Sequence, residues 1–256
     1  MENGYKIVNR FTTFAKRNGE WHHQMVLKKL SSILYSVKLE TGPEIESKRL
    51  YATAKKYLNE KAHISINVSW ERFLELAVKD ELPVTKPVNE ADAKLRENAE
   101  MCFRDNNNVS PIYGALNWDS SKGGAPSYSP DLWLKVNKEI VENHATFTSR
   151  DSYTILLPYF NNFNIDSARL RLYQEIFDWS GIIDYCLDRF WTIQHYDTPE
   201  YIEAQIWKRL TLDDIDSVHV LKSLHSDLVQ ELNSGLLDKQ RSSRIVSMLK
   251  IFNLRD

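Results

Sequence analysis

Apolar residues recur at helical spacing in the first 60 residues of the chain. One helix face is marked by Val26, Leu30, Ile33 and Val37, at steps of four, three and four. The run Thr41-Gly42-Pro43 ends this helix, and a second helix is predicted over residues 44–61. The pattern therefore predicts a helical N-terminal lobe over residues 1–62.

From residue 63 onward the pattern changes to a mixture of alternating and helical segments. Ile64, Ile66 and Val68 alternate with polar residues, which is typical of a half-buried strand. Further strands are predicted at residues 111–118, 128–136, 201–207 and 218–221, with a strand start near residue 145. Helices are predicted at residues 70–78, 90–103, 166–190 and 225–254. Residues 111–118 and 128–136 are expected to form a hairpin. The fold class is therefore α+β: a mixed or antiparallel sheet over residues 63–256, a helical N-terminal lobe and a closing C-terminal helix.

The strand at residues 201–207 carries the most informative alternation. One face would hold the apolar residues Ile202, Ala204 and Ile206, and the other would hold Tyr201, Glu203, Gln205 and Trp207. Glutamate is an unusual choice for the middle of a strand. Two interpretations are open: an edge strand with a solvated polar face, or a carboxylate and an amide placed together for a nucleotide-sugar site.

Composition narrows the classes of function. The 256 residues carry a formal net charge of −2, so no strong field directs the chain to nucleic acid. No apolar run reaches the ~18 residues of a membrane-spanning helix, and the N-terminus has no apolar signal core. Cys102 and Cys186 lie far apart and are expected to be thiols in a reducing compartment. These features predict a soluble protein of cytosol-like chemistry, with export that needs no cleaved signal left open.

Standard catalytic signatures are absent from the sequence. It contains no phosphate loop, no dinucleotide-binding glycine fingerprint, no G-x-S-x-G and no Cys/His spacing for a metal. His22 and His23 are adjacent, so on a helix they point about 100° apart and do not favour chelation. Kinase, Rossmann and zinc-enzyme classes therefore lose support, and no metal site is expected.

Four blocks nevertheless resemble a known family. In order they are I-S-I-N-V-S-W-E-R (residues 64–72), P-I-Y-G-A-L-N (111–117), A-T-F-T-S-R-D-S (145–152) and Y-I-E-A-Q (201–205), with Gly124-Ala125-Pro126 between the second and third. They resemble a bacterial domain family with I-T-x-N-F-x-x-x-R, P-V-Y-G-A-L-N, T-F-x-x-x-D-S and Y-x-E-A-Q blocks. That family is similar to mono-ADP-ribosyltransferases, and in particular to CteC-type effectors, which modify threonine on ubiquitin. The resemblance spans roughly residues 63 to 222.

The resemblance implies an ADP-ribosyltransferase-like core that consumes NAD⁺. Glu203 would be the catalytic residue. The residues expected to contact NAD⁺ are Asn67, Arg72, Tyr113, Gly114, Asn117, Thr146, Phe147, Thr148 and Gln205. In particular, Tyr113 or Phe147 would stack on nicotinamide, Gly114 would let the ligand approach the backbone, and Arg72 or Arg150 would neutralise the pyrophosphate. The sequence departs from the usual pattern because residues 64–68 contain no arginine and because Glu203 precedes its glutamine.

The resemblance also implies a partner and a location. The acceptor would be a hydroxyl side chain, threonine foremost, on a host protein such as ubiquitin. The protein would be a bacterial effector or toxin, made in the bacterial cytoplasm and acting in the host cytosol. Residues 1–62 lie outside the resemblance and are the natural place for target recognition. An NAD⁺ glycohydrolase, in which water replaces the acceptor, and a non-catalytic interaction protein on a degenerate transferase fold are the alternatives.

Several of the candidate residues also have purely structural interpretations. Arg72 would then be an exposed helix residue, Tyr113 a packing residue on the sheet, and Arg150 a solvated surface charge. Asp151 and Ser152 would form only a turn or a helix cap.

Overall fold

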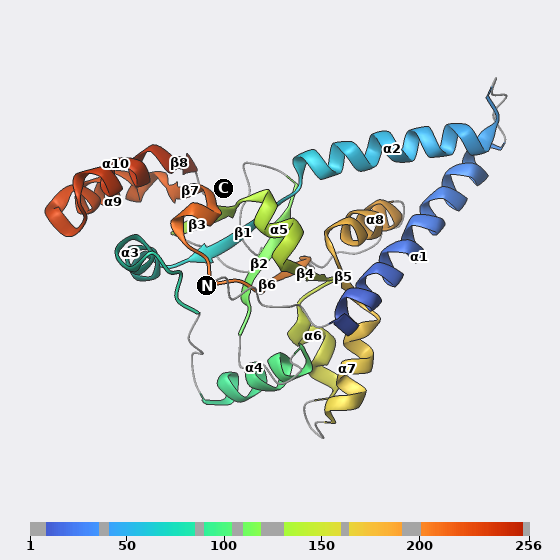
Figure 1. Ribbon diagram of the computed structural model, residues 1–256, viewed down its shortest axis with the longest axis horizontal. Helices are drawn as coiled ribbons and strands as arrows, with labels where there is room; N and C mark the ends of the chain where they lie inside the picture. The colour runs from blue at the N-terminus through green and yellow to red at the C-terminus, as the bar shows by residue number, and fades with distance from the viewer. Residues whose placement is uncertain are drawn as a thin grey trace.

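A computed structural model of the protein describes residues 9–35, 41–84, 90–103, 110–118, 131–159, 164–190 and 201–252. In these residues the fold is α+β, with one eight-stranded sheet of order β5-β4-β6-β2-β1-β3-β7-β8 (Figure 1). The strands are β1 (His63–Val68), β2 (Ile112–Asn117), β3 (Leu132–Val136), β4 (Ala145–Thr148), β5 (Ile176–Phe177), β6 (Glu203–Ile206), β7 (Ile215–Leu221) and β8 (Leu249–Phe252). Neighbouring strands are antiparallel except β7 and β8, which are parallel. The prediction of a mixed or antiparallel sheet is therefore confirmed: the sheet is mixed and mostly antiparallel.

Helices surround this sheet. They are α1 (Asn9–Leu34), α2 (Pro43–Lys61), α3 (Trp70–Lys79), α4 (Glu90–Phe103), α5 (Lys138–His144), α6 (Ser152–Leu156), α7 (Ile165–Tyr173), α8 (Trp179–Phe190), α9 (His225–Glu231) and α10 (Lys239–Met248). The two N-terminal helices, blue in Figure 1, form a long hairpin on one side of the sheet, and α9 and α10 lie at the opposite side beside β7 and β8. The helical N-terminal region is therefore confirmed, and none of the helices in the described residues is long and apolar enough to cross a membrane.

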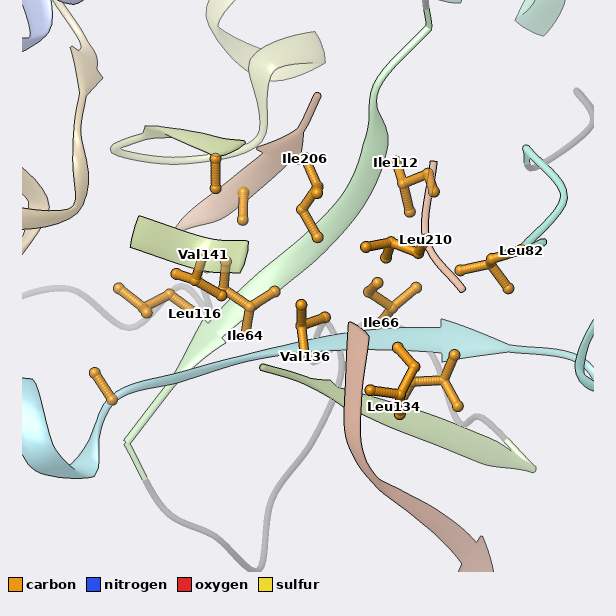
Figure 2. Close-up of a cluster of buried hydrophobic side chains, with 14 of the residues drawn as sticks. Ile64, Ile66, Leu82, Ile112, Leu116, Leu134, Val136, Val141, Ile206 and Leu210 are labelled. Atoms are coloured by element: carbon orange, nitrogen blue, oxygen red, sulfur yellow. The ribbon is translucent and has the colours of Figure 1, made fainter. Parts of the chain in front are cut away.

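One face of the sheet is apolar along almost its whole width. Alternate residues of each strand form it, as strand geometry requires: Ile64, Ile66, Ile112, Leu116, Leu134, Val136, Phe147, Ala204, Ile206, Val218 and Val220, all buried. Figure 2 shows part of this core, where Ile64, Ile66 and Leu134 approach Leu82, Val141 and Leu210. Side chains from α3, α8, α9 and α10 complete the cluster, so this face provides the main hydrophobic stabilisation of the fold.

The opposite face is polar near its middle and adjoins a second apolar cluster. That cluster is built from α4, α6 and α7 and includes Cys102, Phe103, Ile155, Leu156, Leu172 and Ile176. Ile176 pairs with Thr148 of β4, and the half-buried Trp207 packs against the same cluster. The polar centre of the sheet is therefore flanked by packed helices.

The α1–α2 hairpin docks on α8 through a close backbone contact and charged pairs. A Cβ atom placed on Gly19 would lie 2.6 Å from the Cα of Gly181, so the two helices touch where both lack side chains. Asp188 accepts from Lys29 Nζ at 2.6 Å, and Asp184 accepts from Lys55 Nζ at 2.8 Å. Buried carboxylates of α8 therefore hold the hairpin.

The helix predicted over residues 166–190 is wrong as one element. The structure has α7, then β5, then α8, because Ile176 and Phe177 hydrogen-bond to β4 as a short edge strand. Asp178 starts the next helix by accepting from the backbone N–H of Gly181 at 2.7 Å. The continuous apolar rhythm hid this break, because a buried two-residue strand continues the same apolar series.

Two other expectations about chain connectivity are wrong. Of the strand predicted at residues 128–136, the structure describes β3 (Leu132–Val136), and this strand does not form a hairpin with β2, because β1 lies between them and pairs with both. The helix predicted over residues 225–254 is broken at Gly235, which has φ +97°, and the chain ends its described part in β8.

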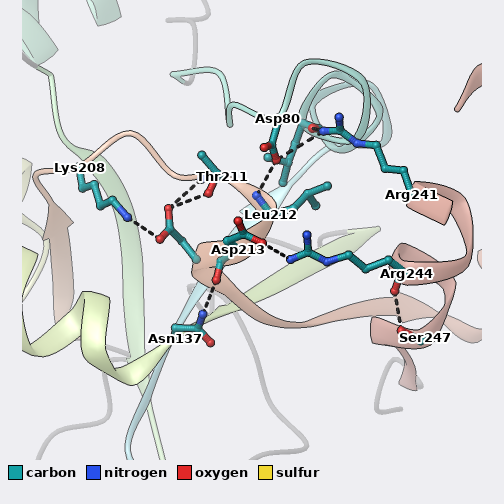
Figure 3. Close-up of polar contacts among 11 residues, drawn as sticks. Asp80, Asn137, Lys208, Thr211, Leu212, Asp213, Arg241, Arg244 and Ser247 are labelled. Carbon is teal, nitrogen blue, oxygen red and sulfur yellow. Dashed lines mark hydrogen bonds and ion pairs between the residues drawn. The ribbon is translucent and has the colours of Figure 1, made fainter. Parts of the chain in front are cut away.

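The connection from β6 to β7 is fixed by a polar cluster (Figure 3). Asp214 accepts from Lys208 Nζ at 2.5 Å and from the backbone N–H of Thr211 at 3.0 Å. Asp80 accepts from the backbone N–H of Leu212 at 3.0 Å, and Arg244 of α10 pairs with Asp213. This cluster ties the chain that leaves β6 to α3 and α10.

Candidate functional site

The four sequence blocks of the resemblance lie on four strands that are adjacent in the sheet. The block at residues 64–72 contains β1 and the start of α3, and the block at 111–117 contains β2. The blocks at 145–152 and 201–205 contain β4 and the start of β6. The sheet order β4-β6-β2-β1 makes these strands neighbours, although the chain from the first to the last covers about 140 residues.

Glu203 and Gln205 lie together on the polar face, as the alternation predicts. Glu203 pairs with Ala115 of β2 and Thr148 of β4, and Gln205 pairs with Tyr113 and Thr146. The edge-strand interpretation is wrong, because β6 has a hydrogen-bonded strand on each side. The polar face here is not solvated either: Glu203 is 5% exposed and Gln205 is 0% exposed.

A directed chain of hydrogen bonds ends at Glu203. The indole Nε1–H of Trp207 donates to Thr146 Oγ1 at 2.8 Å, and Thr146 Oγ1 donates to Gln205 Oε1 at 3.1 Å. The Gln205 amide nitrogen then donates to Glu203 Oε1 at 2.8 Å and to Thr148 Oγ1 at 3.0 Å. Thr146 and Thr148 therefore act on Glu203 through Gln205.

The carboxyl group of Glu203 is electrostatically unusual. Burial, and secondly the nearby carboxylate of Asp151, raise the pKa of Glu203 to about 7, while hydrogen bonds from Ser152 and Gln205 act in the opposite direction. A carboxyl group with a pKa near neutrality exchanges protons readily at physiological pH, which suits acid–base chemistry.

Asp151 and Ser152 contribute more than the helix cap that the sequence suggests. Asp151 does cap α6, accepting from the backbone N–H of Tyr153 at 2.8 Å. In addition, the backbone N–H of Ser152 donates to Glu203 Oε1 at 3.3 Å, and the hydroxyl of Tyr201 donates to Asp151 Oδ2 at 3.2 Å. The start of α6 therefore faces Glu203, and the sequence signal for this was the D-S pair of the third block.

A basic cluster lies at the end of the same face, beyond Tyr113. Arg72 is half-buried, and its Nη2 donates to the carbonyl of Pro83 at 2.6 Å. Burial and the nearby charge of Arg96 lower the pKa of Arg72. The guanidinium of Arg96, on α4, lies 5.8 Å from the centroid of the Tyr113 ring. The interpretation of Arg72 as an exposed helix residue is therefore wrong, and Arg96 is a basic residue that the sequence reasoning missed because it lies outside the four blocks.

Two buried polar atoms at this cluster form no hydrogen bond with the described residues. They are Asn67 Oδ1 and Arg72 Nε. Because unsatisfied buried polar atoms are costly, such atoms are typical of places where a ligand or solvent completes the bonding. Arg150, by contrast, pairs with Glu175 at 3.2 Å.

Three other predicted contact residues have different positions. Asn117 lies on the polar face, where its Nδ2 donates to Ser65 Oγ at 2.6 Å. Phe147 lies on the opposite, apolar face and is 0% exposed, so its position does not fit the expected stacking on nicotinamide. Gly114 also faces the core: a Cβ there would lie 2.8 Å from Ile64 Cγ2, so packing explains this glycine without a ligand.

In the described residues, no group of three or more His, Cys, Asp or Glu side chains is placed to hold a metal ion.

Comparisons with known proteins leave this site without a named counterpart. No protein-family model matches the chain, and no curated protein has a similar sequence.

Proposed function

We propose that this protein is an NAD⁺-consuming mono-ADP-ribosyltransferase with Glu203 as its catalytic residue. The observation that carries the proposal is the meeting of four distant sequence blocks on adjacent strands, around one buried carboxylate of raised pKa. The basic cluster at the end of the same polar face gives further support, because the pyrophosphate of NAD⁺ needs positively charged groups to bind it.

In this proposal Glu203 acts on the ribose that carries nicotinamide. The bond from ribose C1′ to the nicotinamide nitrogen breaks, its electron pair stays on that nitrogen, and C1′ becomes oxocarbenium-like. The carboxylate stabilises the positive charge, as carboxylates do in glycosidases. The acceptor hydroxyl oxygen then bonds to C1′, and its proton passes to Glu203, whose pKa of about 7 suits a general base.

The basic cluster defines the other end of the ligand. Arg72 and Arg96 would hold the pyrophosphate, with Asn67 contributing its unpartnered oxygen to a ribose hydroxyl. Tyr113 would then contact the phosphate–adenosine part. The positive charge of Arg96 would repel a cationic nicotinamide stacked on this ring, but it would not repel an anionic or neutral group. Glu203 and Tyr113 occupy neighbouring rows of the face, roughly 7 Å apart along the strand direction.

The acceptor is proposed from the resemblance: a hydroxyl side chain, threonine foremost, on a host protein such as ubiquitin, with the α1–α2 hairpin available for target recognition. The protein would then act as a bacterial effector in a host cytosol. The NAD⁺ glycohydrolase alternative uses the same site with water as the acceptor.

The test is to incubate the purified protein with biotin-labelled NAD⁺ and a eukaryotic lysate, beside Glu203→Gln. The matched control is Glu231→Gln, which changes a carboxylate on α9, outside the four strands of the site, that accepts from Trp70 Nε1 at 2.7 Å. Protein labelling by wild type and Glu231→Gln, but not by Glu203→Gln, is expected. Nicotinamide release without labelling would instead indicate a glycohydrolase. Neither signal, with no NAD⁺ binding by calorimetry, would refute the proposal and leave a non-catalytic interaction protein.

A further inference from the structure

The orientation of the Gln205 amide decides what Glu203 experiences. With its nitrogen toward Glu203, Gln205 donates a hydrogen bond to the carboxylate. With the amide reversed, its oxygen would face the carboxylate and repel it. Gln205 is fully buried between β2 and β4, so the partners at its other end decide the orientation.

The partner at that end is Thr146, which in turn accepts a hydrogen bond from Trp207. A threonine hydroxyl can either donate to an amide oxygen or accept from an amide nitrogen. Thr146 alone is therefore compatible with both orientations of the Gln205 amide. The indole N–H of Trp207 can only donate, and it donates to Thr146 Oγ1 at 2.8 Å. This donation uses one of the two acceptor positions of the hydroxyl oxygen, and the hydroxyl proton is donated to Gln205 Oε1 at 3.1 Å. With the amide reversed, that proton would lose this acceptor.

We propose that Trp207 is a positioning residue for Glu203, which acts through Thr146 to fix the direction of the Gln205 amide. Trp207 follows β6 directly and is anchored on its other side by Phe103 of α4, with ring centroids 5.6 Å apart. Its backbone N–H donates to the carbonyl of His144 at 2.8 Å, so the indole is held at both backbone and side chain. The inference concerns the carboxylate itself, and only its kinetic consequence rests on the proposed function.

Removal of the indole N–H permits the reversed amide, in which Gln205 donates to Thr146 and presents its oxygen to Glu203. The carboxylate then loses a hydrogen bond and its ionised form is disfavoured. Asp151 is the other charged group that acts on Glu203 among the described residues, and it is unchanged by this substitution. The expected result is an upward shift of about one unit in the pKa of Glu203.

The test is an NMR titration of protein labelled with ¹³C at the glutamate carboxyl carbons, with the Glu203 signal assigned from Glu203→Gln. Trp207→Phe keeps a ring against Phe103 and removes the donor. Trp70→Phe is the matched control, because it removes an indole donor that serves Glu231 on α9. The expected result is a higher Glu203 pKa in Trp207→Phe and the wild-type value in Trp70→Phe.

The double variant tests the route of the effect. Thr146→Val is expected to raise the pKa by a similar amount, Thr146→Ser to leave it near wild type, and Trp207→Phe to add nothing in the Thr146→Val background. An unchanged pKa in Trp207→Phe, or an equal further shift in that background, would overturn the inference. If Trp207→Phe does not fold, the contrast between Thr146→Val and Thr146→Ser decides the question, and equal Glu203 pKa values in these two variants would contradict the inference.

If wild type consumes NAD⁺, the midpoint of the pH–rate profile should lie at higher pH in Trp207→Phe, in step with its Glu203 pKa. Absence of NAD⁺ consumption would refute the proposed function while the titration still decides the role of Trp207.

Discussion

The substitution Glu203→Gln should make the protein more stable at neutral and alkaline pH. Because the folded protein raises the pKa of Glu203 from 4.5 to about 7, the unfolded chain releases this proton at a lower pH than the folded protein does. Stability is therefore lost as pH rises from 4.5, and the loss is complete above pH 7. A difference of about 2.5 units corresponds to roughly 3 kcal/mol. Glutamine keeps an oxygen for the hydrogen bonds from Gln205 and Ser152 but carries no charge.

Urea unfolding of both proteins between pH 4.5 and 8.5 measures this effect. The difference in free energy of unfolding, variant minus wild type, should increase by about 1.4 kcal/mol per pH unit up to pH 7 and then remain constant. Asp151→Asn serves as a second test, because removal of that charge should lower the pKa of Glu203 and end the rise at a lower pH. A difference that is flat across this range, or that falls with pH, would refute the reasoning.

Three other substitutions test the fold and the ligand site. Gly19→Ala should destabilise the protein by about 1–3 kcal/mol in urea unfolding, because the new Cβ would press on the Gly181 backbone, which has no side chain to move; an unchanged midpoint would contradict this contact. Gly114→Ala should cost a similar amount, since its Cβ would lie 2.8 Å from Ile64 Cγ2. If the loss appears only in NAD⁺ binding and not in stability, the packing explanation is wrong. Arg72→Gln should weaken NAD⁺ binding by about tenfold or more through loss of a charge-assisted contact, and calorimetry showing wild-type affinity would remove Arg72 from the site.

The sequence predicted the parts of the site that depend on local alternation. Placing Glu203 and Gln205 on one face required only the two-residue period of a strand. Burial of that face could not be predicted, because it depends on strand order: β6 is a central strand through pairing with β4 and β2, at separations of about 55 and 90 residues. An isolated segment contains no information about such neighbours.

The sequence-based prediction misplaced Phe147 and did not include Arg96. Phe147 belonged to a motif of the resemblance, yet alternation within β4 puts it on the face opposite Thr146 and Thr148. Arg96 has no motif around it and reaches the site only because α4 packs beside Tyr113. Helix packing against a sheet is a tertiary property, and periodicity within α4 does not specify which of its side chains lies over Tyr113.

The energetic cost of Glu203 is itself an argument for chemistry at this position. A glutamine here would keep the hydrogen-bond acceptor that Gln205 and Ser152 require, without the cost of roughly 3 kcal/mol above pH 7 that corresponds to the raised pKa of the carboxyl group. Local rules of stability are commonly broken where a protein binds or reacts. Glu203 is a buried carboxylate held by a directed hydrogen-bond chain, one row of the sheet face from Tyr113, over which Arg96 lies. Under the proposed function, it would stabilise a cationic ribose intermediate through its fixed negative charge.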